Sequence, residues 1–260
     1  LSGVQLAGIE FNSVAAAFTL GGNAIQLSED ITNNSANPQV ISLAIAATDA
    51  ITLNANTEGL ELSGALSGTA GFDKAGGMPL VLSHANNTIS GDITVSGLGA
   101  LVVAADGALG DPNSGLLLNA YYHGELYTLE FEGGVSQSKV MTIGARATSD
   151  PAHVAAITGV NTLGGSMTAV SGGFRYIVSA AADSTLNLDA DLEMINDSSS
   201  ERILRCDGDG IINLNGDVLD SSPSTTTIGV MKANGDSGTL NVVGTKSYNG
   251  GTYADSSTLA

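Results

Sequence analysis

Tryptophan is absent from this 260-residue chain, and other large or reactive side chains are scarce. Phe and Tyr together make up 4% of the residues, which argues against a globular core of large rings and favours a thin, layered core. The single cysteine, Cys206, excludes an internal disulfide framework and has no second ligand at metal-site spacing, so we expect an inert strand residue. No apolar run approaches the ~20 residues that a membrane-spanning helix needs.

Basic residues are also few. Eight Lys and Arg stand against 26 Asp and Glu, which gives a net charge of −18. Such a charge opposes binding to phosphate backbones and anionic lipids, so we expect no nucleic-acid partner and no membrane insertion. The basic residues are scattered except for Arg202 and Arg205, which lie close together beside Cys206. We interpret that pair as a local salt-bridge site.

Short strand-like phrases fill the chain instead. A turn-strand phrase runs from Leu80 to Val95 and recurs with variations at 157–168 and 240–253. A second phrase reads apolar, polar, apolar, polar, small, any, apolar; in a strand its first and third residues face one side, and the small residue permits a corner. This corner phrase occurs at 25–31, 60–66, 186–192 and 212–218.

Recurring units of this kind bury their faces on neighbouring copies, as in solenoids. No stretch has a helical period with caps, and the repeat spacing corresponds to rungs of ~20 to 30 residues. The sequence therefore predicts an all-β parallel β-solenoid of about ten rungs, ~50 Å long, as a single domain over residues 1–260.

A larger duplication is also indicated, because Leu6–Phe11 recurs as Leu126–Phe131. It predicts two related halves, 1–110 and 116–260. Between them, Asp106–Gly115 contains the Gly, Pro and Asn that turns require, and we interpret this segment as the seam.

The phrases resemble the autotransporter-associated β-strand repeat of bacterial surface passengers, whose unit reads approximately G-x-L-x-L-S-G-x-N-T-Y-S-G-x-T-x-V. The resemblance is close over residues 76–103 and 238–259 and loose elsewhere; His84 stands where the family usually has Gly, and Asn87 looks like an insertion. It implies a right-handed parallel β-helix, export through the cell envelope, and a secreted or cell-surface location. It implies no catalytic mechanism, because the repeat is a stalk in that family.

Two groups of residues are candidates for weak binding sites. Calcium favours oxygen ligands from Asp-rich and Gly-rich turns, although the EF-hand and β-roll spacings are missing here, and the alternative is a solvated turn followed by outward-facing polar strand positions. The candidate calcium ligands are Asp207, Asp209, Asn213, Asn215 and Asp217. Sugar rings stack on exposed aromatic residues, and the candidate carbohydrate platform is Tyr121, Tyr122 and Tyr127, which with Phe131 could equally fill the core.

We expect no catalytic residues. Gly235–Gly238 (Gly-Asp-Ser-Gly) imitates a serine-protease nucleophile loop, and His153 precedes it in the chain, but the tetrapeptide reads as a turn before a strand. A polysaccharide-cleaving β-helix needs a basic residue beside carboxylates. Its nearest candidates are Arg202 and Arg205 with Asp207 and Asp209.

The sequence thus favours a non-enzymatic structural segment of a secreted or cell-surface bacterial fibre without a required cofactor. The chain begins without Met and ends just after a repeat motif, so we expect a piece of something longer. Its expected partners are neighbouring repeats of the same chain, other copies stacked end to end into filaments, and surface glycans. The alternative is a carbohydrate-binding or polysaccharide-cleaving β-helix protein.

Overall fold

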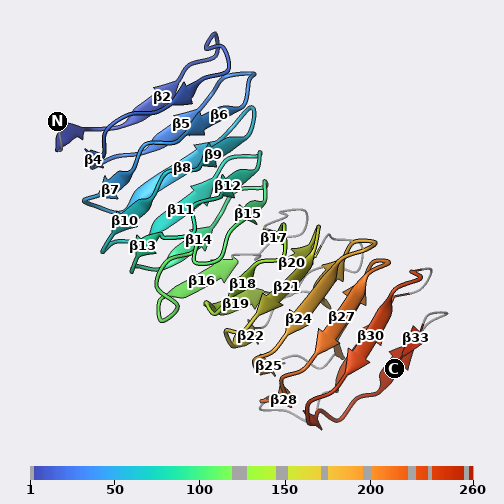
Figure 1. Ribbon diagram of the computed structural model, residues 1–260. Coiled ribbons are helices and arrows are strands. Elements are labelled where there is room, and N and C mark those ends of the chain that lie inside the picture. Colours follow the sequence, from blue (N-terminus) through green and yellow to red (C-terminus); the bar gives the residue numbers. More distant parts are fainter. Residues whose placement is uncertain are drawn as a thin grey trace.

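The computed structural model describes residues 3–118, 128–144, 152–170, 175–195, 201–221, 227–233, 236–254 and 258–259. These residues form 33 strands and no helix, and the strands pair in parallel. The chain winds as a right-handed parallel β-helix whose rungs stack in chain order, with the two termini at opposite ends of a rod (Figure 1). The predicted fold class is confirmed.

Four sheets form the faces of the rod, and two of them each cover one half of the chain. Sheet A consists of β1 (Val4–Leu6), β4 (Ile25–Leu27), β7 (Ile45–Ala47), β10 (Leu66–Gly68) and β13 (Thr88–Ile89). Sheet D consists of β18 (Ser136–Gln137), β21 (Val160–Leu163), β24 (Thr185–Leu188), β27 (Ile211–Leu214), β30 (Thr239–Val242) and β33 (Thr258–Leu259). Strands of both sheets precede a sheet B strand in the chain, so A and D occupy the same place in the rung.

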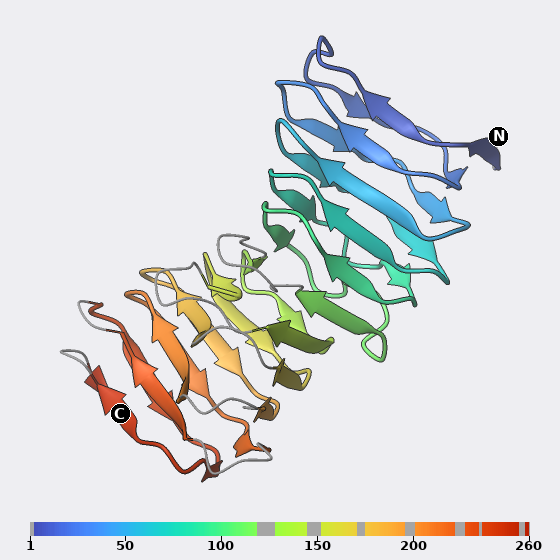
Figure 2. The ribbon, with the colours of Figure 1, turned by 180° about the vertical axis from the view of Figure 1, so that it is seen from behind.

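The other two sheets run the length of the rod, and Figure 2 shows the same stack from behind. Sheet B consists of β2 (Ile9–Phe11), β5 (Ile31–Asn33), β8 (Ile51–Ala55), β11 (Phe72–Ala75), β14 (Ile93–Val95), β16 (Gly115–Leu118), β19 (Val140–Gly144), β22 (Met167–Val170), β25 (Leu192–Met194), β28 (Val218–Asp220) and β31 (Lys246–Ser247). Sheet C consists of β3 (Thr19–Leu20), β6 (Gln39–Ile41), β9 (Leu60–Leu62), β12 (Leu80–Leu82), β15 (Leu101–Val103), β17 (Leu129–Phe131), β20 (Val154–Ala156), β23 (Arg175–Ala180), β26 (Arg202–Asp207), β29 (Ile228–Lys232) and β32 (Thr252–Ala254). Each contains 11 strands, close to the ten rungs expected.

The core is a set of aliphatic columns along the rod axis. Three residues is the commonest strand length, and in strands such as β4, β9 and β14 the first and third side chains are buried while the second is half-buried, as strand alternation requires. The register places like residues over one another: Leu80 pairs with Leu60 on one side and with Leu101 on the other. Burying a leucine of this kind contributes roughly 1.5–3 kcal/mol to the free energy of unfolding. Because every rung repeats this contribution, even a thin core is stable.

Corners bring successive rungs so close that some of them admit no side chain. A Cβ on Gly71 would lie 1.6 Å from the carbonyl oxygen of Asp92 on the next rung. Gly76 has a φ of +80°, in the left-handed region, and a Cβ there would lie 2.3 Å from the carbonyl oxygen of Ala55. The glycines that break up the strand phrases are therefore steric requirements of the corners.

Sheet A gives way to sheet D across a segment without strands, residues 104–114. This segment fills the missing rung position: the Asp111 N–H donates to Ile89 O at 2.8 Å, and the Gln137 side chain donates to Ala105 O at 3.0 Å. The rung also lengthens here, since bonded side chains on adjacent rungs are 21 residues apart at Gln5 and 28 apart at Asn213. The expected seam, Asp106–Gly115, lies at this change.

The expected duplication of Leu6–Phe11 as Leu126–Phe131 is wrong. Ile9–Phe11 forms β2 in sheet B, whereas Leu129–Phe131 forms β17 in sheet C, so the two segments are not equivalent positions. Both match the same short pattern because every face of the rung uses apolar-polar-apolar strands. Within the described residues, no helix has the length and apolar character needed to cross a bilayer.

Candidate functional site

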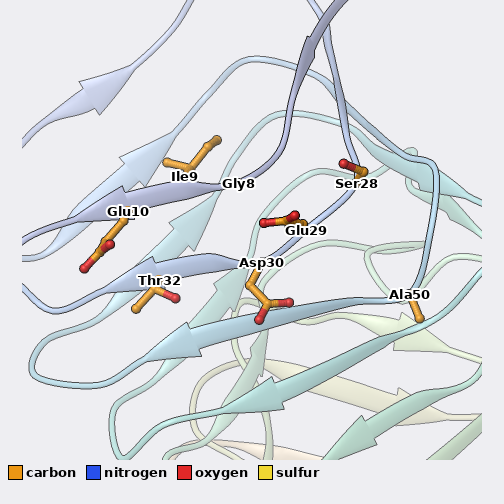
Figure 3. Close-up of a pocket in the computed structure, with 8 residues that line it drawn as sticks. All are labelled: Gly8, Ile9, Glu10, Ser28, Glu29, Asp30, Thr32 and Ala50. Carbon is orange, nitrogen blue, oxygen red and sulfur yellow. The ribbon is translucent and has the colours of Figure 1, made fainter.

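A groove of about 560 Å³ follows the corner between sheets A and B near the N-terminal end. Its lining comes from three successive rungs, and Figure 3 shows Asp30 pointing toward the rung below it. A second hollow of about 380 Å³ continues along the same corner past Thr52 and Asp73. The first groove is lined by Gly8, Ile9, Glu10, Ser28, Glu29, Asp30, Thr32 and Ala50. Oxygen atoms therefore line it, without a basic side chain.

The aspartates at this corner are acceptors for backbone groups of the next rung. Asp30 Oδ1 accepts the Thr52 N–H at 2.7 Å, and Asp92 Oδ1 accepts the Gly115 N–H at 2.7 Å. The same carboxylate-to-backbone hydrogen bond recurs in the second half of the chain, where Asp217 Oδ1 accepts the Thr245 N–H at 2.6 Å. These carboxylates hold one rung to the next, so the groove has a structural explanation that needs no substrate.

The five candidate calcium ligands are distributed around one rung. Asp207 ends β26 in sheet C, Asn213 lies in β27 of sheet D, and Asp217 precedes β28 of sheet B. Asp209 and Asn215 stand at the two corners between these strands. Within the described part of the chain, no group of three or more His, Cys, Asp or Glu side chains is arranged to hold a metal ion.

Each of these five side chains has a protein partner. Asp207 pairs with Arg205 Nε at 2.7 Å; burial raises the pKa of Asp207, and Arg205 partly offsets this. Asp209 Oδ1 accepts the N–H and hydroxyl of Ser237 at 2.7 and 3.0 Å, bonds that lower the pKa of Asp209. Asn215 donates to Asp189 at 2.7 Å. The calcium site stays a prediction.

Asn213 belongs to an amide ladder on the outer face of sheet D. Its Nδ2 donates to Asn187 Oδ1 at 2.6 Å, and its Oδ1 accepts from Asn241 Nδ2 at 2.6 Å. Asn187 in turn donates to Thr162 Oγ1 at 3.2 Å. The ladder crosses four rungs in the direction of the rod axis. Asn213, which the sequence analysis proposed as a calcium ligand, thus joins adjacent rungs.

The candidate carbohydrate residues Tyr121, Tyr122 and Tyr127 lie outside the described residues. Phe131, the fourth member of that aromatic group, is fully buried in the core. The carbohydrate site therefore stays a prediction.

The protease-like motif has no catalytic arrangement in its described part. The Ser237 hydroxyl donates to Asp209, not to a histidine. His153 is fully buried; its Nδ1 accepts the Ile177 N–H at 3.0 Å and its Nε2 contacts Gly144 O. Both ring nitrogens are engaged with backbone groups, so the imidazole is held as part of the fold.

The predicted arginine pair gains a third member that the sequence did not reveal. Arg175 on β23 interacts with both Arg202 and Arg205; burial lowers the pKa of Arg175, and Glu201 opposes that change. Arg202 is only 5% exposed, and Arg205 is paired with Asp207. A buried Arg202 and a half-buried Arg205 that is already paired are a poor receptor for an acidic polymer.

Sequence reasoning also missed that three lysines lie inside the rod: Lys74, Lys139 and Lys232 are each at most 1% exposed. Lys139 Nζ donates to Leu109 O at 2.9 Å and to Ser114 Oγ at 2.5 Å. Burial lowers the pKa of Lys74 and of Lys139 to about 8 in each case. The sequence signal for this burial was the alternation of the strand that contains Lys74, which places its side chain at an inward position.

In comparisons with known proteins, no family model, no curated protein and no solved structure matches the chain.

Proposed function

We propose that this chain is a non-enzymatic structural segment of a secreted or cell-surface fibre, in which the β-helix supplies length. The observation that carries the proposal is the ladder of sheets B and C, whose 11 strands each continue from one end of the rod to the other. A parallel ladder has open hydrogen-bonding edges at both ends. Length is added there by further rungs of the same chain or by another copy.

The use of polar groups supports this role. Asp30, Asp92 and Asp217 bond to the backbone of the next rung, and Asn213 bonds to the rungs on both sides. An enzyme directs acid, base or nucleophile side chains toward a shared substrate position. These four polar side chains bond along the rod instead.

The location in the proposal rests on the resemblance to bacterial surface repeats, where such a rod carries other features outward. The scarcity of cysteine and the charge of −18 are compatible with a soluble, extended stalk that does not adhere to membranes or nucleic acid.

A one-rung deletion tests whether the rungs are modular units of length. Ile45 pairs with Leu66 on the next rung, so removing residues 46–66 joins equivalent positions. The shortened chain is expected to fold with the same circular dichroism spectrum and to lose ~4.8 Å of length by small-angle X-ray scattering. Loss of folding would contradict a modular structural role.

Glycan arrays and lyase assays on the intact chain test the alternative. The structural role predicts no binding and no turnover. Glycan binding that disappears in the Tyr121→Ala and Tyr122→Ala variants would overturn it and favour a carbohydrate-binding protein.

A further inference from the structure

The face of the rod that sheets A and D form has a break in its ladder. Sheet A ends at β13 and sheet D begins at β18, and the strand-free segment, residues 104–114, occupies the rung position between them. Sheets B and C continue past this position, since β14 pairs with β16 and β15 pairs with β17. Parallel strands therefore join these rungs on two faces, whereas another kind of contact joins them on the third.

Side chains from the neighbouring rungs hold the strand-free segment. Asn87 Nδ2 donates to Ala108 O at 2.7 Å from the rung before, and Gln137 Nε2 donates to Ala105 O at 3.0 Å from the rung after. These bonds reach backbone carbonyl groups that a strand would pair in a ladder. The segment therefore depends on a few specific side chains.

Lys139 fastens the segment from inside the rod. The residue is 1% exposed, and its Nζ donates to Leu109 O, Asp111 O and Ser114 Oγ at 2.9, 2.8 and 2.5 Å. A lysine ammonium group has three N–H donors, so this one segment receives all of them. Because Lys139 follows β18 in the chain, the contact ties the segment to the first strand of sheet D.

From the broken ladder and this attachment we infer that the strand-free segment opens and closes as a unit while sheets B and C stay paired, and that Lys139 controls its closing. The buried apolar side chains of the segment are Ala108 and Leu109. Regions with few buried apolar contacts open at a lower free energy than the whole protein unfolds. The inference concerns the fold itself and does not depend on the proposed role.

Opening would change the surface of the rod part-way along its length, where the chain in Figure 1 passes from β13 to β18. These two strands are the terminal strands of sheets A and D, so their edges beside the segment would lose their cover. An uncovered edge presents unpaired N–H and C=O groups to any extended chain. The closed segment therefore protects two sheet edges, and the open form gives the rod a point of flexibility.

The protonation state of Lys139 changes with closing. Burial lowers its pKa to about 8, and the charged groups that face it, Asp111 in the segment and Asp92 at the A/B corner, oppose that change. In the open form the ammonium group is hydrated and regains its ordinary pKa of 10.5. The closed form thus binds fewer protons between pH 8 and 10.5, so the open population should fall by up to about ten-fold per pH unit across that window.

Native-state hydrogen exchange of the intact chain, measured by NMR, tests separate opening. The Asp111 N–H donates to Ile89 O at 2.8 Å, so its exchange reports on the segment. The Ser90 and Thr162 N–H groups bond between neighbouring rungs of sheets A and D at 3.0 and 2.8 Å, and they are the matched reporters. The protection factor should be at least about ten-fold lower for Asp111 than for either of them. Equal protection of all three amides would overturn separate opening.

A pH series tests the part played by Lys139. Between pH 8 and 10.5 the protection factor of the Asp111 amide should rise by up to about ten-fold per pH unit in the wild type, and this rise should disappear in Lys139→Met. Lys74→Met is the matched control and should keep the rise, because Lys74 is equally buried, has a pKa also lowered to about 8, and lies in β11, where the ladder is unbroken. An unchanged rise in Lys139→Met, or its loss in Lys74→Met, would overturn the assignment to Lys139.

Discussion

Methionine substitution at two buried lysines should change stability by different amounts. Lys74 and Lys139 are both essentially unexposed, and burial lowers both pKa values to about 8. Methionine has a similar shape and no charge, so it relieves a comparable burial cost at either position. The difference in unfolding free energy between the two variants therefore measures the contribution of the hydrogen bonds that each ammonium group donates.

The acceptors differ. Lys74 Nζ donates to Gly76 O at 3.0 Å, and that oxygen also accepts the Gly99 N–H at 3.3 Å, so it keeps a donor in Lys74→Met. Lys139 Nζ holds three acceptors in the strand-free segment: Leu109 O at 2.9 Å, Asp111 O at 2.8 Å and Ser114 Oγ at 2.5 Å. Asp111 O also accepts the Ser114 N–H at 3.4 Å and the Ser114 hydroxyl at 3.1 Å, so Leu109 O is the acceptor that Lys139→Met deprives of its donor. An unsatisfied buried acceptor costs about 1–3 kcal/mol. We expect Lys139→Met to be about 2 kcal/mol less stable than Lys74→Met, which should match or exceed the wild type.

Guanidinium unfolding at pH 7, followed by far-ultraviolet circular dichroism, measures this difference from the midpoints, provided the slopes agree. An unequal slope would show that the segment 104–114 unfolds separately from the rest. Equal losses in the two variants, or a larger loss in Lys74→Met, would refute the explanation by acceptor count.

Four further results follow from the structure. Stability of the wild type should rise between pH 8 and 10.5, because in that window the unfolded chain binds the proton that folding removes from Lys74; in Lys74→Met the rise should be smaller by up to ~1.4 kcal/mol per pH unit. Gly71→Ala should cost more than about 2 kcal/mol, since its Cβ would lie 1.6 Å from Asp92 O. Asn213→Ala should cost about 1–2 kcal/mol, because two ladder bonds are lost. Cys206, which is fully buried and whose thiol pKa is raised by burial, should react with a thiol reagent only after unfolding.

Each result has a control. The pH slope of Lys74→Met is compared with the wild type in the same buffers, and an identical slope would remove Lys74 as its source. Gly77→Ala places a Cβ 3.9 Å from its nearest neighbour and should be tolerated; equal costs at Gly77 and Gly71 would contradict the steric account. Asn241→Ala breaks one described ladder bond and should cost about half as much as Asn213→Ala. Reaction of Cys206 in the folded protein at the rate of a free thiol would contradict its burial.

The strands were predictable from the sequence, but their assignment to faces was not. The corner phrase at 25–31 joins sheet A to sheet B, and at 186–192 it joins sheet D to sheet B, whereas at 60–66 it joins sheet C to sheet A. Alternation specifies which side of a strand is buried, and all faces of the rung share one core. A short pattern therefore cannot distinguish them, which is why the duplication seemed real.

The burial of the interior polar residues could not be predicted from the sequence for a different reason. Asn87 looked like an insertion, yet its side chain accepts the Leu66 N–H at 2.8 Å and donates to Ala108 O at 2.7 Å, on the rungs before and after it. Lys139, one of the scattered basic residues, is likewise buried. Their partners are 21 to 30 residues away, so they become visible only when the rungs are in register.

The change in rung length has a mechanical consequence. A pull along the axis peels rungs one at a time, because each rung is bonded only to its neighbours. A rung of 21 residues releases about 70 Å of extended chain, and one of 28 residues about 95 Å, although both add the same height to the rod. Register partners are 21 residues apart at Val4, 26 apart at Thr185 and 22 apart at Val230, so under tension successive rungs release different lengths of chain.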